Sequence, residues 1–158
     1  MGVPIDVIDL RRVLGYFPTG VTVITTLDAS GSPVGVTASS FNTVSLEPPL
    51  ILWCIAKDAY SAEAFEAAEY FAVNVLGNQQ ADVSNNFARQ SEDKFDGIAF
   101  ASGRGGSPLL ENTAAFFECK TWKFYDGGDH TIVVGEVLGF QANDSVLPLV
   151  FSRGSYGT

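Results

Sequence analysis

The stretch that decides the fold runs from Pro33 to Ile55 and reads PVGVTASSFNTVSLEPPLILWCI. It begins with alternating small and β-branched residues and ends, after two prolines, in the apolar run Leu50 to Ile55, so both ends are predicted to be buried strands. A polar loop separates them, with hydroxyl and amide side chains at Thr37, Ser39, Ser40, Asn42 and Ser45. This loop either lines a groove for a flat, polar ligand or satisfies its own backbone at a strand edge.

Length and composition indicate one domain over residues 1–158. With 46% hydrophobic and 17% charged residues, the chain can bury one core and is too short for two ordinary ones. No apolar run approaches the roughly 20 residues that span a bilayer, and the N-terminal basic pair follows the apolar positions. We therefore expect a cytoplasmic protein with no membrane partner. Cys54 and Cys119 lack CxxC spacing, which favours buried free thiols.

The net charge of −9 argues against nucleic acid as a partner, because the basic residues are few and scattered. It also sets a condition on anionic ligands. Since the field of the whole protein repels a phosphate, a site for one needs local attraction from backbone amides, a helix N-terminus or a placed lysine or arginine. One histidine and no Cys/His cluster predict no metal site.

Periodicity along the chain predicts more strands than helices. The expected helices cover residues 5–17, 62–69 with Ser61 as N-cap, and a stretch from 77 to about 90. Besides the two strands of the central stretch, the expected strands cover residues 21–27, 70–76, 113–124 and 131–141, the last two as a long hairpin. Residues 92–108 read as a loop, and residues 147–158 as a short strand or an ordered tail. Hairpin connections without a repeating βαβ order favour a mainly β fold, an antiparallel barrel with peripheral helices.

Known catalytic motifs are missing from the sequence. There is no GxSxG, no P-loop and no GxGxxG after a strand. Lys57 and Ser61, near the start of the second expected helix, could hold a phosphate together with the hydroxyl loop, although a loop lysine is more often simply solvated. His130 lies where the long hairpin turns, next to Asp129, and a turn histidine is usually a surface residue.

Seven segments together resemble the flavin reductase family, the small NAD(P)H-dependent components that supply reduced flavin to two-component monooxygenases. They are FPTGVTVITT (17–26), GVTASSFNTVSLEPPLILWCI (35–55), FAVNVL (71–76), KFDGI (94–98), PLLENTAAFFEC (108–119), GGDHTIVVGEV (127–137) and PLVFSRGSYG (148–157). The resemblance covers nearly the whole chain. It implies a homodimeric, FMN-binding split β-barrel that holds FMN or FAD in a groove near the subunit interface.

The resemblance also assigns roles by position. The groups expected to line the isoalloxazine and ribityl chain are Thr37, Ala38, Ser39, Ser40, Phe41, Val44 and Ser45. Lys57 and Ser61 would face the phosphate, Phe87 and Ala88 would close a loop over the flavin, and Cys54 to Ala56 would form the strand floor. His130 would contact the nicotinamide, with Arg153 and Tyr156 as further candidates. Ser152 and Ser155 depart from the family pattern, where relatives often carry His or Tyr and a basic residue.

The implied reaction is hydride transfer from NADH, or alternatively NADPH, to flavin, for which the protein mainly stacks the two rings and needs little acid–base chemistry. Without a basic cluster for a 2′-phosphate, NADH is favoured. We expect delivery of the reduced flavin to a partner monooxygenase. The alternatives are a flavin-binding electron carrier, a reductase of another acceptor such as a corrinoid, and a barrel that binds another small aromatic ligand.

Overall fold

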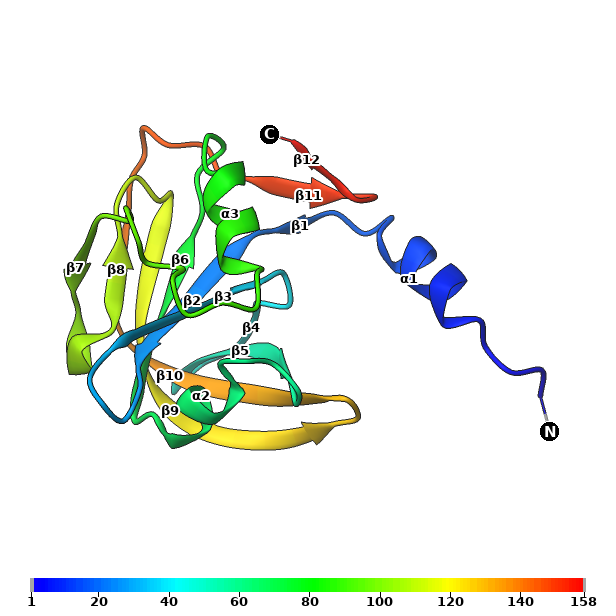
Figure 1. Cartoon of the computed structure of the whole chain (residues 1–158), viewed down its shortest axis with the longest axis horizontal. Coiled ribbons are helices and arrows are strands. Elements are labelled where there is room, and N and C mark those ends of the chain that lie inside the picture. Colours follow the sequence, from blue (N-terminus) through cyan, green and yellow to red (C-terminus); the bar gives the residue numbers. More distant parts are fainter. Residues whose placement is uncertain (1, 158) are drawn as a thin grey trace.

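A curled antiparallel sheet of seven strands forms the body of the molecule in the computed structural model, which describes residues 2–157 (Figure 1). The strand order is β3-β2-β6-β9-β10-β5-β4. The strands of this sheet are β2 (Thr22–Leu27), β3 (Pro33–Ala38), β4 (Asn42–Leu46), β5 (Pro49–Ala56), β6 (Tyr70–Val75), β9 (Ala115–Gly127) and β10 (His130–Ala142). This architecture confirms the predicted mainly β, antiparallel split barrel.

The barrel is open where its two edge strands face each other. β3 and β4 are the first and last strands of the sheet, yet they follow one another in the sequence and are joined by residues 39–41. We call this opening, crossed by residues 39–41, the split. The hydroxyl-rich segment therefore lies at the one place where the sheet of the described chain is not closed by strand pairing.

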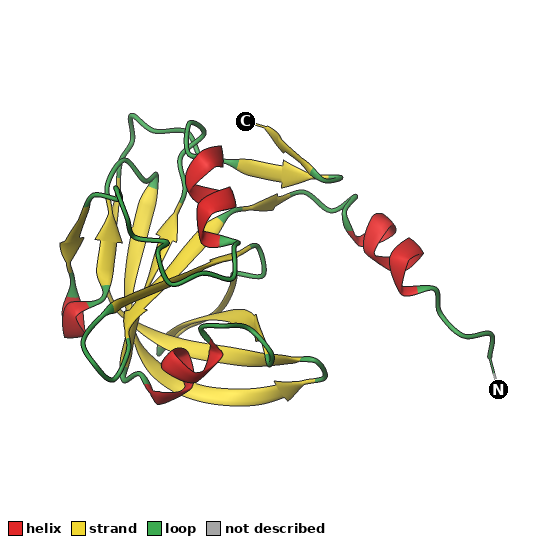
Figure 2. Ribbon diagram, viewed as in Figure 1, coloured by secondary structure: helices red, strands yellow, loops and turns green. Residues whose placement is uncertain are grey.

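Two small sheets and three helices surround the barrel (Figure 2). The tail pairs β11 (Val150–Ser152) with β12 (Ser155–Gly157) and with β1 (Thr19–Gly20), and β7 (Phe100–Ser102) pairs with β8 (Pro108–Leu110) around the short 3-10 helix η1 (Arg104–Gly106). The helices are α1 (Val7–Leu14), α2 (Ala62–Ala67) and α3 (Ala81–Phe87). Helix α1 projects away from the barrel beside the tail, and none of its residues is buried (Figure 1).

Two apolar clusters make up the core. The first packs Trp53 against Phe65 and Phe71 inside the barrel, with ring centroids 4.9 and 6.0 Å away. The second joins Phe87 of α3 to neighbouring strands and the tail. Asn74, the polar residue in an apolar strand, is fully buried; its amide nitrogen donates to the Val23 carbonyl, and its side-chain oxygen accepts from the Leu110 amide at 2.8 Å. It therefore fixes β8 against the barrel.

The structure corrects two predictions of secondary structure. Residues 42–46 form β4, and parts of the expected loop over 92–108 form β7, η1 and the start of β8. The four residues 42–44 and 46 of β4 are exposed, so the strand has no alternation of buried and exposed residues to reveal it. The long hairpin and the strands over 21–27 and 70–76 are confirmed to within a few residues, and the tail contains two short strands.

Candidate functional site

Two hydroxyls at the split are engaged with backbone groups. The Thr37 hydroxyl donates to the Ser84 carbonyl oxygen at 2.6 Å. The Ser40 hydroxyl accepts from the Cys54 amide at 2.8 Å and donates to the Cys54 carbonyl at 3.3 Å. The Ser40 hydroxyl therefore satisfies the backbone of β5, whereas the Thr37 hydroxyl satisfies a carbonyl of helix α3. Ser39 is exposed, and Ala38 is buried.

A partly exposed floor lies beside this segment on β5 and β10. Ala56 pairs with His130, and Cys54 pairs with Ile132. Directly opposed residues of antiparallel strands point to the same face of the sheet, so these four side chains share one surface. All four are partly exposed. The structure thus brings the predicted floor residues Cys54 and Ala56 together with the predicted catalytic residue His130.

His130 is the first residue of β10, and its ring is held by the preceding residue. Its Nδ1 lies 2.7 Å from Oδ1 of Asp129. This hydrogen bond is the largest of the effects that lower the pKa of Asp129, so Asp129 is a carboxylate at neutral pH. A carboxylate accepts from a protonated Nδ1, which leaves Nε2 to face a ligand. The side chain is 46% exposed and therefore accessible.

Lys57 contacts the β9–β10 hairpin through both its side chain and its backbone. Its ammonium forms a surface ion pair and hydrogen bond with Asp126, and its amide donates to the Asp129 carbonyl at 3.0 Å. The hydrogen bond from Lys57 is the main cause of a lowered pKa at Asp126. The ammonium that was predicted to face a ligand phosphate is thus already paired with a carboxylate.

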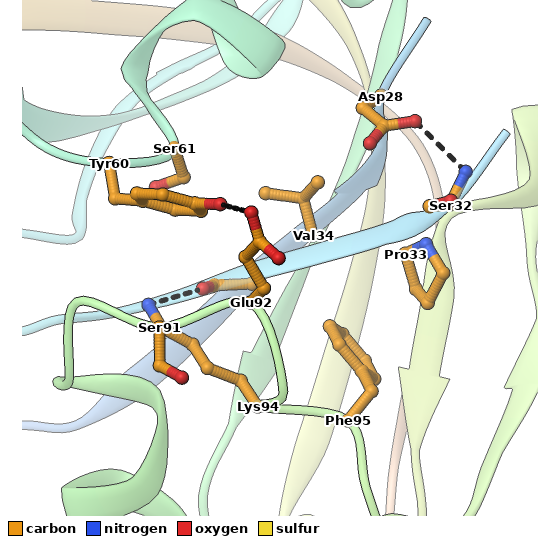
Figure 3. Close-up of a pocket in the computed structure, with 11 residues that line it drawn as sticks. Asp28, Ser32, Pro33, Val34, Tyr60, Ser61, Ser91, Glu92, Lys94 and Phe95 are labelled. Atoms are coloured by element: carbon orange, nitrogen blue, oxygen red, sulfur yellow. Dashed lines mark hydrogen bonds between the residues drawn. The ribbon is translucent and has the colours of Figure 1, made fainter. Parts of the chain in front are cut away.

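Ser61 precedes α2 as predicted, but within residues 2–157 its side chain makes no capping hydrogen bond. It is buried and lines a pocket of about 340 Å³ (Figure 3). Three segments surround this pocket: residues 28–35 of the first hairpin, residues 60–61, and residues 91–95. The Lys94 side chain, 6% exposed as a residue, is part of its wall.

Phe87 and Ala88 lie at the end of α3 and not in a loop. Phe87 has no exposed surface, and a Cβ placed on Gly35 would come within 2.7 Å of its ring, so the phenyl group is a core residue packed on β3. Ala88 caps the helix and is exposed. Of the two residues expected to cover a flavin, Ala88 alone presents its side chain at the surface.

The tail residues differ in their surroundings. The Tyr156 hydroxyl lies 2.8 Å from the Ser84 hydroxyl and donates to the Asn85 side-chain oxygen at 2.9 Å, so Tyr156 meets α3 close to Thr37. Arg153 instead lies over the Tyr16 ring, 5.1 Å from its centroid, after helix α1. Figure 1 places this tail hairpin far from the β9–β10 turn that carries His130.

Phe41, Val44 and Ser45 lie toward the other end of the floor. Phe41 stacks on Phe117, with ring centroids 5.6 Å apart. Ser45 pairs with Leu50, whereas His130 pairs with Ala56, six positions further along β5 and therefore roughly 20 Å away at about 3.3 Å per residue. Within one chain, Ser45 and His130 cannot contact the same ring system.

Ser84 and Lys94, for which the sequence predicts no role, occupy central positions in the structure. Ser84 joins Thr37 to Tyr156, and Lys94 reaches from the 91–95 segment into the core. Neither has a sequence signal of its own, because both depend on which segments α3 meets in the folded chain. No group of three or more potential metal-binding side chains occurs in the described part of the chain. Across residues 2–157, no helix has the length and apolarity required to cross a membrane.

An antiparallel barrel with an open split, a half-exposed floor and a neighbouring pocket defines a small-ligand-binding split barrel. The chain belongs to the flavin reductase like domain family, whose model matches residues 14–158. The resemblance of the sequence segments to this family is thereby confirmed.

Relatives with assigned activities extend this match. The chain is 44% identical over 158 residues to the Mycobacterium tuberculosis protein named flavin-dependent monooxygenase, reductase subunit HsaB, covering 99% of this chain and 84% of that protein. It is 46% identical over 154 residues to the stachydrine N-demethylase reductase subunit Stc3 of Rhizobium meliloti, covering 96% and 66%. The chain spans about half the length of other curated relatives that it matches.

A solved structure has the same fold. The Streptomyces globisporus NADH:FAD oxidoreductase SgcE6, in complex with NAD and FAD fragments, superposes with a TM-score of 0.93 at 41% identity. The match covers 100% of this chain and 95% of that one. The similarity therefore concerns the complete barrel and its peripheral elements.

Proposed function

We propose that this protein is an NADH-dependent flavin reductase that reduces FMN or FAD and supplies the reduced flavin to a flavin-dependent monooxygenase. The observation that carries the proposal is the half-exposed floor, where Cys54, Ala56 and His130 share one face beside the split. A flat ring can lie on such a floor because the paired side chains form a continuous, partly apolar surface. Relatives named as reductase components support the same activity.

The residues of the floor fit a flavin by their chemistry. The exposed Ser39 supplies a hydrogen-bond partner at the split, and the floor supplies apolar contact. When bound, the flavin supplies the ring that accepts a hydride from NADH. The protein orients the two rings and excludes water between them. Most of the rate gain of such a transfer arises from this orientation.

His130 orients the nicotinamide in this proposal. Asp129 holds the imidazole through Nδ1, so Nε2 remains as a hydrogen-bonding group for a carboxamide. No proton has to be moved for hydride transfer itself, so His130 acts by position. NADH is preferred to NADPH because the acidic chain, at net charge −9, offers an extra phosphate little attraction.

We further propose that the protein works as a homodimer. Large apolar side chains are exposed on two surfaces: α1, where Ile8 is 80% exposed, and the end of the sheet, where Leu46 is 90% and Phe140 75% exposed. Contiguous apolar surface of this kind is typical of an interface.

The experiment follows NADH oxidation at 340 nm with the purified protein, with and without added FMN or FAD. A rate that rises saturably with flavin is expected, because flavin is a diffusible substrate in this proposal. Yellow protein with slow oxidation of every nicotinamide would instead establish an electron carrier. Colourless protein without stimulation by either flavin would contradict both functions. Size-exclusion chromatography with light scattering tests the dimer.

A further inference from the structure

The face of the sheet that carries His130 extends onto a third strand. β10 lies between β5 and β9 (Figure 1). On β10, Ile132 pairs with Cys54 of β5 on one side and with Tyr125 of β9 on the other. Opposed residues of antiparallel strands point to the same face, and so do residues two apart on one strand. Tyr125 therefore shares the face of Cys54, Ile132 and His130, and the floor is three strands wide.

Tyr125 presents an aromatic ring on this face. It is 49% exposed, and within residues 2–157 its ring pairs with no other aromatic ring. The neighbouring Phe124 pairs with the buried Val133 and so points to the opposite face. An exposed ring beside the half-exposed His130 suits a flat ligand, because aromatic rings attract one another beyond the area that they bury.

Lys123 follows on the same face, one row further from the hairpin turn. It is exposed and pairs with Val134, two positions after Ile132. Among residues 2–157, no carboxylate forms an ion pair with it. The other lysines are engaged: Lys57 with Asp126, Lys120 with Glu69, and Lys94 with two backbone carbonyls. In the described chain, Lys123 is thus the lysine whose charge is available to an anion.

The charges along this face favour one orientation of a ligand. At the turn, the Asp129 carboxylate is bound to His130 and repels an anionic group. Lys123 lies opposite Val134, four positions after His130 and therefore about 13 Å along the strand. A matching ligand has an uncharged flat ring near His130 and Tyr125 and an anionic group toward Lys123. The nicotinamide half of NADH has this order, with an uncharged dihydronicotinamide ring, a ribose and a phosphate.

We propose that Tyr125 and Lys123 bind the nicotinamide nucleotide of NADH, Tyr125 by contact with the dihydronicotinamide ring and Lys123 by pairing with the adjoining phosphate. The inference rests on the proposed function. It gives the nucleotide the β9 side of the floor, and leaves to the flavin the β5 side, where Cys54 is joined to Ser40 at the split. It also supplies the placed lysine that a phosphate needs on a chain of net charge −9.

The test compares two reductants at saturating FMN: NADH, and N-methyl-dihydronicotinamide, which carries the same ring without a phosphate. The rate without protein is subtracted. Lys123→Met should raise KM for NADH about fivefold and keep kcat/KM for the phosphate-free reductant within about twofold. Tyr125→Ala should lower kcat/KM about fivefold for both reductants, and Tyr125→Phe, which keeps the ring, should restore most of the loss.

Lys120→Met and Phe124→Leu are the matched controls. Lys120 is a lysine of the same strand that pairs with Glu136, six positions after His130, so its removal changes the net charge equally but far from the turn. Phe124 adjoins Tyr125 and points to the opposite face. Both controls should keep kcat/KM for each reductant within about twofold of the unaltered protein.

Three results would overturn the proposal. The first is an equal rise of KM for NADH in Lys123→Met and Lys120→Met, since the field of the whole protein would then explain both. The second is an equal loss with both reductants in Lys123→Met, and the third is full activity of Tyr125→Ala. If the unaltered protein oxidised neither reductant, the proposed function would be refuted. NADH binding to Lys123→Met and to the unaltered protein, followed by NADH fluorescence, would still decide the role of Lys123.

Discussion

Two lysines near the start of α2 differ in almost every physical respect. The Lys57 side chain is 47% exposed and paired with Asp126, whereas Lys94 is buried and held by two carbonyl oxygens. Lys57 is the lysine that the sequence favours for a phosphate, because it precedes a predicted helix. The comparison teaches that the position of a lysine in a motif does not reveal whether its charge is free. Burial and partners decide this, and both are set by the tertiary fold.

The largest effect is expected where the buried lysine meets β3. Gly35→Val would place a Cβ 2.7 Å from the Phe87 ring and 3.3 Å from Phe95, and would disturb the carbonyl that Lys94 contacts. Overpacking of this kind should lower the free energy of unfolding by about 3 kcal/mol in urea titrations. Gly20→Val, where no atom lies within 4 Å of the added Cβ, is the matched control. If Gly35→Val lowered the free energy of unfolding by less than about 1 kcal/mol, α3 would be able to shift away from β3 at little cost.

Removal of the buried charge itself comes next. In Lys94→Met the carbonyls of Gly35 and Phe87 lose their donor, and we expect unfolding to become about 2 kcal/mol easier. Lys123→Met should change the value by less than about 0.5 kcal/mol. If Lys94→Met were as stable as the unaltered protein, relief of the buried charge would offset the lost hydrogen bonds, and Lys94 and Lys57 would not differ in their contribution to stability.

The third prediction concerns activity at an exposed residue, His130. His130→Ala should lower kcat/KM for NADH about tenfold, while the flavin dissociation constant, measured by fluorescence quenching, stays within about twofold. Asp129→Asn, which weakens the hold on the imidazole, should give a smaller loss in the same direction. An equal loss of NADH reduction and flavin affinity would reject the orienting role.

The smallest effect is expected from Lys57→Met. A surface ion pair contributes little, so the melting temperature should fall by about 1 °C at neutral pH. The pKa of Asp126 is lowered below its ordinary value of 3.8 in the folded state, so the pair stabilises the protein above that pH. The contribution is lost as the pH falls through the folded-state pKa, and the two proteins should then melt together. A difference that persists in acid would point to another contact of Lys57.

Much of the fold follows from local pattern. The alternation in residues 115–127 and 130–142 predicts the long hairpin, because each strand has one face toward the core. The sequence does not predict β4, because most of its side chains are exposed in the single chain. Its extended conformation depends on its pairing with β5. Asn74 is similar: its polarity is visible in the sequence, but its partner on β8 is not.

The candidate site was predictable in part. The Gly-Asp-His turn and the Cys54 to Ala56 strand are adjacent because β5 pairs with β10, and the family resemblance already placed them together. The contacts of β3 with α3 and of α3 with the tail could not be predicted, since Thr37, Ser84 and Tyr156 come from three distant segments. The same holds for Lys94, whose burial depends on α3 packing over Gly35.

The split has a kinetic consequence. β3 and β4 close the barrel through the crossing at residues 39–41 and not through a ladder of hydrogen bonds with each other. Widening the split therefore breaks the hydrogen bonds between Ser40 and Cys54 and leaves every strand pair intact. Amide protons on the outer edges of β3 and β4 should exchange with deuterium long before those of the central strand β6. A molecule seated at the split can accordingly leave on the timescale of local opening, with no need for the sheet to unfold.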